Sequence, residues 1–264
     1  MSGSQTILVN HLNPVNLVNN TLSYFLSQEN LSLGKPATIG PPEAGHILLS
    51  HRAKKHDEIK IQGPDGKRFL CEIIATSKLS LTIKPFQILE PSPEPVTAVT
   101  LFQSVVSEKA LDFIFQKGTE LALSAIVLFN SANTATKLTA EVFKKKRERW
   151  NKILIESAKQ CERAKWPSLD FAADVDQVIK KVGASDKVFL ADISGTPIKD
   201  LILDQSFKSF KSCSIIIGPE GGFTQSEITS FKSLPNLQTL SLGPILLRAE
   251  TAALASLAII QTLI

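Results

Sequence analysis

Two apolar runs near the C-terminal end of the sequence each stop at a Gly-Pro pair. Residues 214–227 read S-I-I-I-G-P-E-G-G-F-T-Q-S-E, and residues 240–253 read L-S-L-G-P-I-L-L-R-A-E-T-A-A. In both segments an apolar stretch typical of a buried strand is followed by residues that begin a helix. Two strand-to-loop exits so close together predict one pocket built from two backbone loops. Such a pocket suits a small polar cofactor held by main-chain groups.

Composition narrows the class of protein. Hydrophobic residues make up 43% of the 264 residues, enough for the core of one large domain or two modest ones. The net charge of +4 permits RNA as a partner without requiring it. Cys71, Cys161 and Cys213 form no C-x-x-C pair, which favours a reducing compartment over a disulfide framework or a metal site. Because neither a signal peptide nor an apolar run of about 18 residues is found, we expect a soluble cytoplasmic protein.

A proline-rich segment divides the chain. Residues 90–95 read E-P-S-P-E-P, which can join neither a helix nor a central strand and therefore predicts an extended linker. The part before it, residues 1–90, is predicted to be β-rich, with a tight turn at P-D-G-K (64–67). Its predicted strands are 58–61, 68–75 and 79–89, which together indicate a small barrel. The first 45 residues predict no firm element.

The part after the linker, residues 96–264, alternates strand and helix. Strands are predicted at 96–103, 125–129, 187–191, 214–217 and 239–242. Helices are predicted at 108–122, 141–165, 224–231 and 251–264. This alternation is typical of an α/β domain with a mostly parallel sheet covered by helices.

The two loops carry distinct chemistry. In the first loop, the glycines after the strand let the backbone approach a ligand closely. Thr224 and Glu227 then form a capping box at the start of a helix. An ordinary strand-to-helix turn would show the same residues. No G-K-[ST] or G-x-G-x-x-G follows, so neither a Walker loop nor dinucleotide binding is indicated. In the second loop Arg248 and Glu250 interrupt an apolar run. They form either a surface ion pair at a helix start or part of the pocket.

Four segments in order carry a family resemblance. They are I-I-I-G-P-E-G-G-F-T-Q-S-E-I (215–228), L-G-P-I-L-L-R-A-E-T-A-A (242–253), F-Q-K-G-T-E-L (115–121) and E-S-A-K-Q-C-E-R (156–163), the last of the form E-x-x-x-Q-C-x-R. Together they resemble the SPOUT methyltransferases, and most closely the bacterial 16S ribosomal RNA uridine-N3 methyltransferases. The resemblance covers the chain from residue 96 to its end.

The resemblance implies a deep trefoil knot, a homodimer, no metal, and S-adenosylmethionine bound in a bent form by backbone of the two loops. The apolar helix 251–264 would then pack at the dimer interface, although packing inside one subunit fits its pattern too. The cofactor-binding residues we expect are Leu190, Gly218, Glu220, Gly221, Leu242, Gly243, Ile245 and Leu247.

The implied reaction is methylation of N3 of a specific uridine in 16S ribosomal RNA of the small subunit. The imide nitrogen must lose its proton, and Arg248 would stabilise the negative charge that develops on the base. Glu120 or Glu250 would accept the proton or hold that arginine.

The N-terminal part resembles the family's PUA-like barrel less closely. His46 to Arg52 aligns with the pattern H-x-x-x-V-L-R but has Ser50-His51 in place of V-L, and His56-Asp57 stands where Gly-Asp is usual. The RNA-binding residues we expect are Arg52, Lys144, Lys145 and Arg163. Alternatively, Arg52 is a solvated surface arginine, and Lys144 and Lys145 lie on the solvated face of a long helix.

Two other functions remain open from the sequence. One is a non-catalytic RNA-binding module on the ribosome, against which the intact glycine loops argue. The other is a SPOUT enzyme that acts on transfer RNA, a different ring atom or a ribose oxygen. The E-x-x-x-Q-C-x-R helix and the R-A-E-T segment favour uridine.

Overall fold

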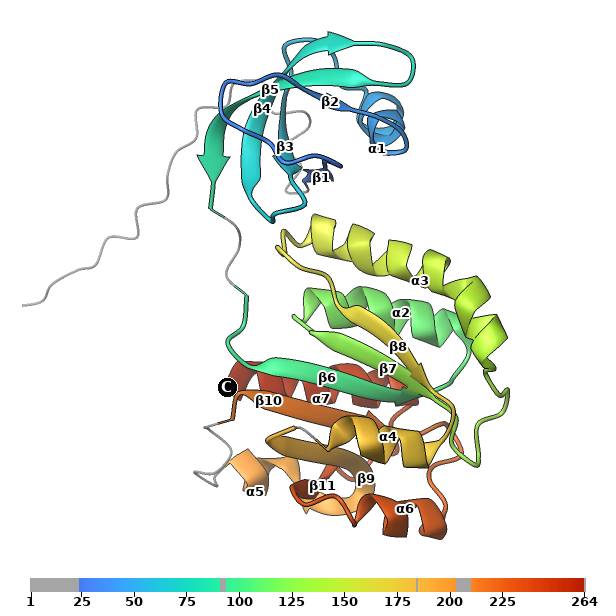
Figure 1. Ribbon diagram of the computed structural model, residues 1–264. Coiled ribbons are helices and arrows are strands. Elements are labelled where there is room, and N and C mark those ends of the chain that lie inside the picture. The colour runs from blue at the N-terminus through green and yellow to red at the C-terminus, as the bar shows by residue number, and fades with distance from the viewer. Residues whose placement is uncertain (1–23, 91–93, 184, 203–209, 264) are drawn as a thin grey trace, which may run out of the picture. The chain divides into compact units, whose positions relative to one another are not determined.

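The computed structural model describes residues 24–90, 94–183, 185–202 and 210–263 (Figure 1). The chain divides between Pro91 and Ser92 into two compact units, each with its own sheet and its own hydrophobic core. The division falls within the proline-rich segment from which the sequence predicted a linker.

The first unit is built on a five-stranded mixed sheet with the order β1-β3-β4-β5-β2. Its β1 pairs parallel with β3, and the other neighbours pair antiparallel. Alternate side chains of β3 and β4, such as Ile59, Ile61 and Phe69, enter one core because strand side chains alternate between faces. The strands are β1 (Phe25–Leu26), β2 (Ala37–Ile39), β3 (Glu58–Gln62), β4 (Arg68–Thr76) and β5 (Leu81–Leu89).

The three strands predicted in this unit are found, with one shifted start. Strand β5 begins at Leu81 rather than at residue 79, because Ser77 and Ser80 close a turn in which the Ser77 hydroxyl accepts from the Ser80 N–H at 3.0 Å. The sequence missed β1, β2 and the short helix α1 (Glu43–Gly45) in the first 45 residues. Residues 1–23 lie outside the described residues.

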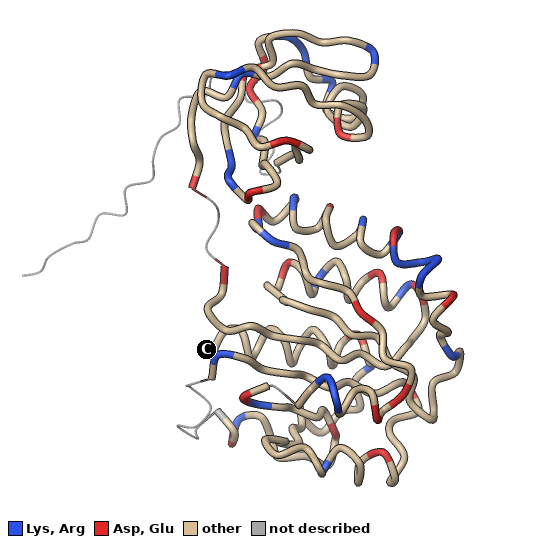
Figure 2. Tube along the Cα trace, viewed as in Figure 1, with Lys and Arg blue, Asp and Glu red and all other residues tan. Residues whose placement is uncertain are grey.

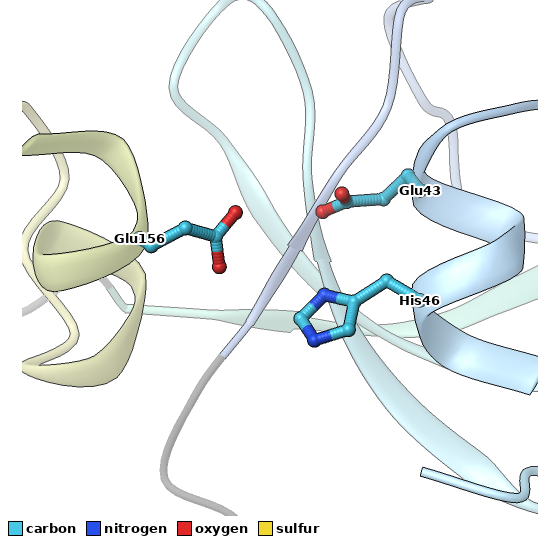
Figure 3. A group of neighbouring side chains, drawn as sticks. All are labelled: Glu43, His46 and Glu156. Carbon is cyan, nitrogen blue, oxygen red and sulfur yellow. The ribbon is translucent and has the colours of Figure 1, made fainter. Parts of the chain in front are cut away.

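Helix α1 continues into a π-helical turn, η2 (His46–Ser50). The Glu43 carboxylate accepts from the backbone N–H of Leu26 at 2.7 Å, which ties this segment to β1. The His46 ring packs edge-on against Phe25, with ring centroids 5.8 Å apart. Figure 3 shows Glu43 and His46 side by side on this segment, and it also labels Glu156, which in the second unit forms an ion pair with Lys159 at 3.2 Å.

The second unit contains a six-stranded sheet with the order β11-β9-β10-β6-β7-β8, in which all neighbours pair parallel. The strands are β6 (Ala98–Ser104), β7 (Ala125–Phe129), β8 (Ser168–Ala172), β9 (Lys187–Pro197), β10 (Ser212–Ile217) and β11 (Leu237–Ser241). The helices are α2 (Glu108–Glu120), α3 (Ala140–Gln160), α4 (Val175–Val182), α5 (Ile198–Ile202), α6 (Gln225–Phe231) and α7 (Ala249–Leu263). The predicted parallel α/β sheet is therefore confirmed.

The helices cover both faces of this sheet (Figure 1). Helices α2, α3 and α7 share one core with the sheet, and α4 and α6 share a second core on the other face. On α7, Ala253, Leu257 and Ile260 are fully buried in the first of these cores. Leu254 and Ala258 of the same helix are half-buried. Most of the apolar face of α7 is thus covered within its own unit.

The sequence prediction placed two helix ends too late and missed three elements. Helix α2 ends at Glu120 rather than at residue 122, because Ala122 adopts a φ of 62°. Helix α3 ends at Gln160 rather than at residue 165, because Glu162 adopts a φ of 59°, which a right-handed helix cannot include. Strand β8 and helices α4 and α5 were missed. Helix α4 did carry a signal, since Asp174 caps it by accepting from the Gln177 N–H at 2.9 Å.

The backbone at His56 yields a stability prediction. His56 has a φ of 74°, which a side chain with a Cβ adopts at a cost of about 1 kcal/mol. Its ring contacts Glu72 at 2.7 Å, but both side chains are well exposed, so the pair adds little. We expect His56→Gly to raise the free energy of unfolding by about 0.5–1 kcal/mol in urea titrations. His56→Ala keeps the Cβ and should give no gain; equal effects of both variants would contradict the explanation.

Candidate active site

A cavity of about 250 Å³ lies at the carboxyl ends of β10 and β11 and beside the middle of β9. Its walls come from three segments: residues 191–193 of β9, residues 217–223 after β10 and residues 240–252 around the end of β11 and the start of α7. Ligands of open parallel sheets bind at this edge, where the loops after the strands converge. The two glycine-bearing loops do therefore line one cavity.

Most of the expected cofactor-binding residues line this cavity. They are Gly218, Glu220, Leu242, Gly243, Ile245 and Leu247. Leu190 is fully buried in β9, directly before the wall residue Ala191. Gly221 lies between two wall residues but faces Asn133 rather than the cavity. Contact of these residues with a cofactor stays a prediction.

The first loop is held by the start of α6. Thr224 and Glu227 form the predicted capping box, with the Glu227 carboxylate accepting from the Thr224 N–H at 2.8 Å. The same carboxylate accepts from the backbone N–H of Ala132 at 2.7 Å. Burial works to raise the pKa of Glu227, but these hydrogen bonds outweigh it and hold the pKa below its usual value. The Glu227 side chain is thus stabilised in its ionised form, in which it holds the end of the first loop through these hydrogen bonds.

The third wall segment was not predicted. Thr239 of β11 pairs with Leu190 of β9, but the next residue, Leu240, pairs with Thr196, so residues 191–195 form a bulge in β9, and residues 191–193 of this bulge line the cavity. A Cβ at Gly195 would lie only 2.8 Å from backbone atoms of Leu240. Glycine is therefore required where these two backbones approach each other so closely.

Asp192 fixes the shape of this bulge. One oxygen of its carboxylate accepts from the Ser194 N–H at 2.7 Å and from the Ser194 hydroxyl at 2.6 Å. Asp192 also lines the cavity. The sequence D-I-S-G (192–195) is typical of such a turn, so the signal was present but was passed over.

Arg248 and Glu250 flank a cavity wall. Ala249 between them lines the cavity, Arg248 is exposed, and Glu250 is half-buried. Neither side chain forms an ion pair within the described residues, so the surface pair considered from the sequence is not observed there. Both flank the wall residue Ala249 without lining the cavity themselves.

Glu120 lies elsewhere in the unit. Its carboxylate accepts from the Lys117 ammonium at 2.8 Å at the end of α2. The neighbouring Ala122 carbonyl accepts from Gln261, which lies 12 residues along α7 from the cavity wall at Ala249, a helical span of about 18 Å. The structure therefore does not bring Glu120 and Arg248 together within one chain.

The expected RNA-binding residues fall into two groups. Arg52, Lys144 and Lys145 are exposed. Figure 2 shows the run of basic residues at the start of α3, of which Lys146 pairs with Glu108 and Arg149 pairs with Asp112 on α2. Part of the basic cluster thus fastens α3 to α2, and Lys144 and Lys145 are left at the surface.

Arg163 differs from the other three residues, because it is only 8% exposed and its guanidinium is hydrogen-bonded within the protein. Its guanidinium donates to the Glu94 carboxylate at 2.8 Å and to the carbonyls of Thr119 and Leu123 at 3.0 and 2.8 Å. These bonds join the residue after α3 to the end of α2 and to the segment before β6. The observed contacts are those of a buried structural arginine.

The parallel sheet with a loop-built cavity at its carboxyl edge defines an α/β enzyme fold. A family model described as an RNA methyltransferase domain matches residues 92–261. The chain therefore belongs to the RNA methyltransferase family, as the sequence resemblance implied. None of the helices in the described residues has the length and apolar character needed to cross a bilayer.

Individual relatives agree with this assignment. The chain is 29% identical over 240 residues to the Bacillus subtilis "Ribosomal RNA small subunit methyltransferase E", covering 89% of this chain and 93% of the relative. A structure of that enzyme from Neisseria gonorrhoeae with bound S-adenosylmethionine has a TM-score of 0.80 and 24% identity, covering 91% and 97% of the two chains. A Legionella pneumophila methyltransferase with bound S-adenosylmethionine has a TM-score of 0.81 and 24% identity, covering 94% and 98%. These two structures establish a shared fold.

The close approach at Gly195 predicts a strong effect of one methyl group. Gly195→Ala would force a Cβ against the Leu240 backbone, and we expect it to lower the free energy of unfolding by about 2–3 kcal/mol. Gly183→Ala is the control, since its Cβ would lie 3.7 Å from the nearest atoms and its φ is −55°. Urea titration measures both. Equal stabilities of the two variants would contradict the close approach of these two backbones.

The contacts of Arg163 predict a stability effect that does not depend on RNA. Arg163→Met leaves Glu94 and two carbonyls without their buried donor, and should cost about 3–5 kcal/mol in the free energy of unfolding. Arg147→Met, on the exposed side of α3, should cost less than about 0.5 kcal/mol. If Arg163→Met were as stable as the parent but bound RNA more weakly, the RNA-binding prediction would be favoured instead.

Proposed function

We propose that this chain transfers the methyl group of S-adenosylmethionine to N3 of a uridine in 16S ribosomal RNA of the small subunit. The observation that supports it most directly is the cavity walled by the two glycine-bearing loops at the carboxyl edge of the sheet. Named relatives are small-subunit ribosomal RNA methyltransferases, and structures with the same fold hold S-adenosylmethionine. The choice of N3 rests on the sequence resemblance alone.

The residues present fit this cofactor. Two carboxylate residues, Asp192 and Glu220, line the cavity, and no described lysine or arginine does. A cationic ligand is therefore favoured over an anionic one. Apolar side chains such as Ile245 and Leu247 offer surface for an adenine ring, and the loop backbone offers hydrogen-bonding groups for polar atoms. When bound, S-adenosylmethionine supplies an electrophilic methyl group.

The chain's own residues would bind and orient the base and manage its charge. Arg248 stands beside the cavity wall with an exposed guanidinium, where it would stabilise a uracil anion. Glu250, one residue beyond Ala249, is the carboxylate placed to accept the imide proton or to hold Arg248. Glu120 would reach this end of α7 only from a second copy of the chain.

The proposal includes a homodimer. Ile193, Ile245 and Leu246 lie at the cavity with exposed fractions of 54%, 75% and 79%. Large apolar side chains gathered at one exposed place are typical of surfaces that a partner covers. A second copy would cover these side chains and the half-buried residues of α7.

The remaining parts of the proposal concern the two units. The second unit, residues 96–264, would be a SPOUT domain with a trefoil knot, supported by the match of an RNA methyltransferase domain model to residues 92–261. The first unit, residues 1–90, would be a PUA-like barrel that binds RNA, supported by its five-stranded mixed sheet and by the exposed Arg52. Lys144 and Lys145 would add contacts to RNA phosphates.

Arg248 provides the test of the reaction. Arg248→Ala should lower kcat by about 100-fold, because it removes the charge that stabilises the base anion, while S-adenosylmethionine binding in calorimetry stays near the parental value. Arg248→Lys should be intermediate, and Lys232→Ala, at the end of α6, should match the parent. The assay uses small subunits from a strain that lacks this chain, with mass mapping of the methylated nucleotide.

The same mapping separates the alternatives. A product at N3 of a uridine in 16S ribosomal RNA is the expected result. Methylation of transfer RNA, of another ring atom or of a ribose oxygen would place the chain elsewhere among the SPOUT enzymes. Parental activity of Arg248→Ala would remove Arg248 from the proposed machinery.

A further inference from the structure

One side chain links the loop after β7 to the glycine loop of the cavity. The Asn133 amide nitrogen donates to the Gly221 carbonyl at 3.1 Å and to the Gly222 carbonyl at 3.1 Å. Two carbonyl acceptors fix which end of the amide faces them, because only the NH₂ group can donate. These contacts join residues 88 and 89 positions apart in the chain.

The loop that carries Asn133 is firmly anchored. The Ala132 N–H donates to the buried Glu227 carboxylate at 2.7 Å. The Ser131 N–H donates to the Thr134 hydroxyl at 2.9 Å, and that hydroxyl contacts the Ser104 hydroxyl of β6 at 3.0 Å. Asn133 therefore extends from a segment that is tied on both sides to the sheet and to α6.

The glycine loop depends on external contacts for its shape. Gly222 has a φ of 68°, and its N–H donates to the Pro219 carbonyl at 2.9 Å to close a turn. A Cβ at Gly221 would lie 3.1 Å from the Asn133 Cβ, so glycine permits the close approach of the two segments. The Asn133 amide binds the carbonyls of two consecutive residues, Gly221 and Gly222, and so fixes the planes of their peptide groups. These peptide groups lie next to or within the cavity wall, which includes Glu220 and Gly222.

We propose that Asn133 is a positioning residue that preorganises the glycine loop for the cofactor. Asn133 does not line the cavity, so its effect would pass through the orientation of residues 220–222. This inference rests on the proposed function, since it takes S-adenosylmethionine as the ligand of the cavity. Preorganisation of a binding loop lowers the cost of ordering it when the ligand binds.

Two variants of the full chain test the proposal. Asn133→Ala removes both hydrogen bonds and should weaken S-adenosylmethionine binding about fivefold to tenfold in calorimetry, as expected for the loss of one or two such bonds. Asn133→Asp keeps the shape but turns an acceptor toward the two carbonyls, so it should weaken binding more than alanine does. The KM for S-adenosylmethionine should rise while kcat stays within about twofold of the parent.

Asn151→Ala, on α3 and away from the cavity, is the matched control and should bind as the parent does. A purely steric role would make the isosteric Asp variant milder than the Ala variant, which would overturn the proposal. Parental binding by both Asn133 variants would overturn it as well. If the parent itself bound no S-adenosylmethionine, the proposed function would fail instead, so the two failures are distinguishable.

Discussion

The cavity depends on the close approach of the paired strands β9 and β11 at Gly195 and Leu240. Gly195 lies so close to Leu240 that no side chain fits between them. This contact lets β9 leave the sheet after Leu190, bulge through residues 191–195 and rejoin β11 at Thr196. Because backbone atoms on both sides cannot move out of the way as a flexible side chain can, this close contact constrains the bulge that carries the third wall of the cavity.

Around that close contact, the cavity is assembled from main-chain loops that polar side chains hold in place. Asp192 shapes the bulge through Ser194, Glu227 anchors the exit of the glycine loop, and Asn133 joins that loop to the segment after β7. The carboxylates at the walls make the cavity favourable for a cation. The same edge of the sheet thus offers backbone groups for recognition and negative charge for the proposed cofactor, with Arg248, the residue proposed to act on the base, beside it.

Local pattern predicted much of this arrangement. Strand β7 was predicted with its observed bounds because its five residues are continuously apolar, as buried parallel strands are. The capping box at Thr224 and the convergence of two loops followed from turn and cap chemistry that acts over a few residues. Six of the eight expected cofactor-binding residues line the cavity for the same reason, since each belongs to one of those loops.

Features that depend on contacts between residues far apart in the chain could not be predicted from the sequence. Arg163 lies after the end of α3 and is engaged by Glu94 and by carbonyls near the end of α2, which no local pattern reveals. The need for glycine at position 195 arises from Leu240, 45 residues away in sequence. Glu120 belongs to a segment that matches the family, but it lies at the other end of α7 from Arg248. The resemblance of separate segments could not reveal this, since it carries no information on the distance between them.

The most direct test of the central claim is a calorimetric titration of the full chain with S-adenosylmethionine, compared with the same titration of Gly195→Ala. We predict one binding site per chain in the parent, and binding at least tenfold weaker in any folded fraction of the variant, because the added methyl group displaces a cavity wall. Absence of binding by the parent, or parental affinity in a folded Gly195→Ala protein, would contradict the claim that the close approach of Gly195 to Leu240 shapes the cofactor site.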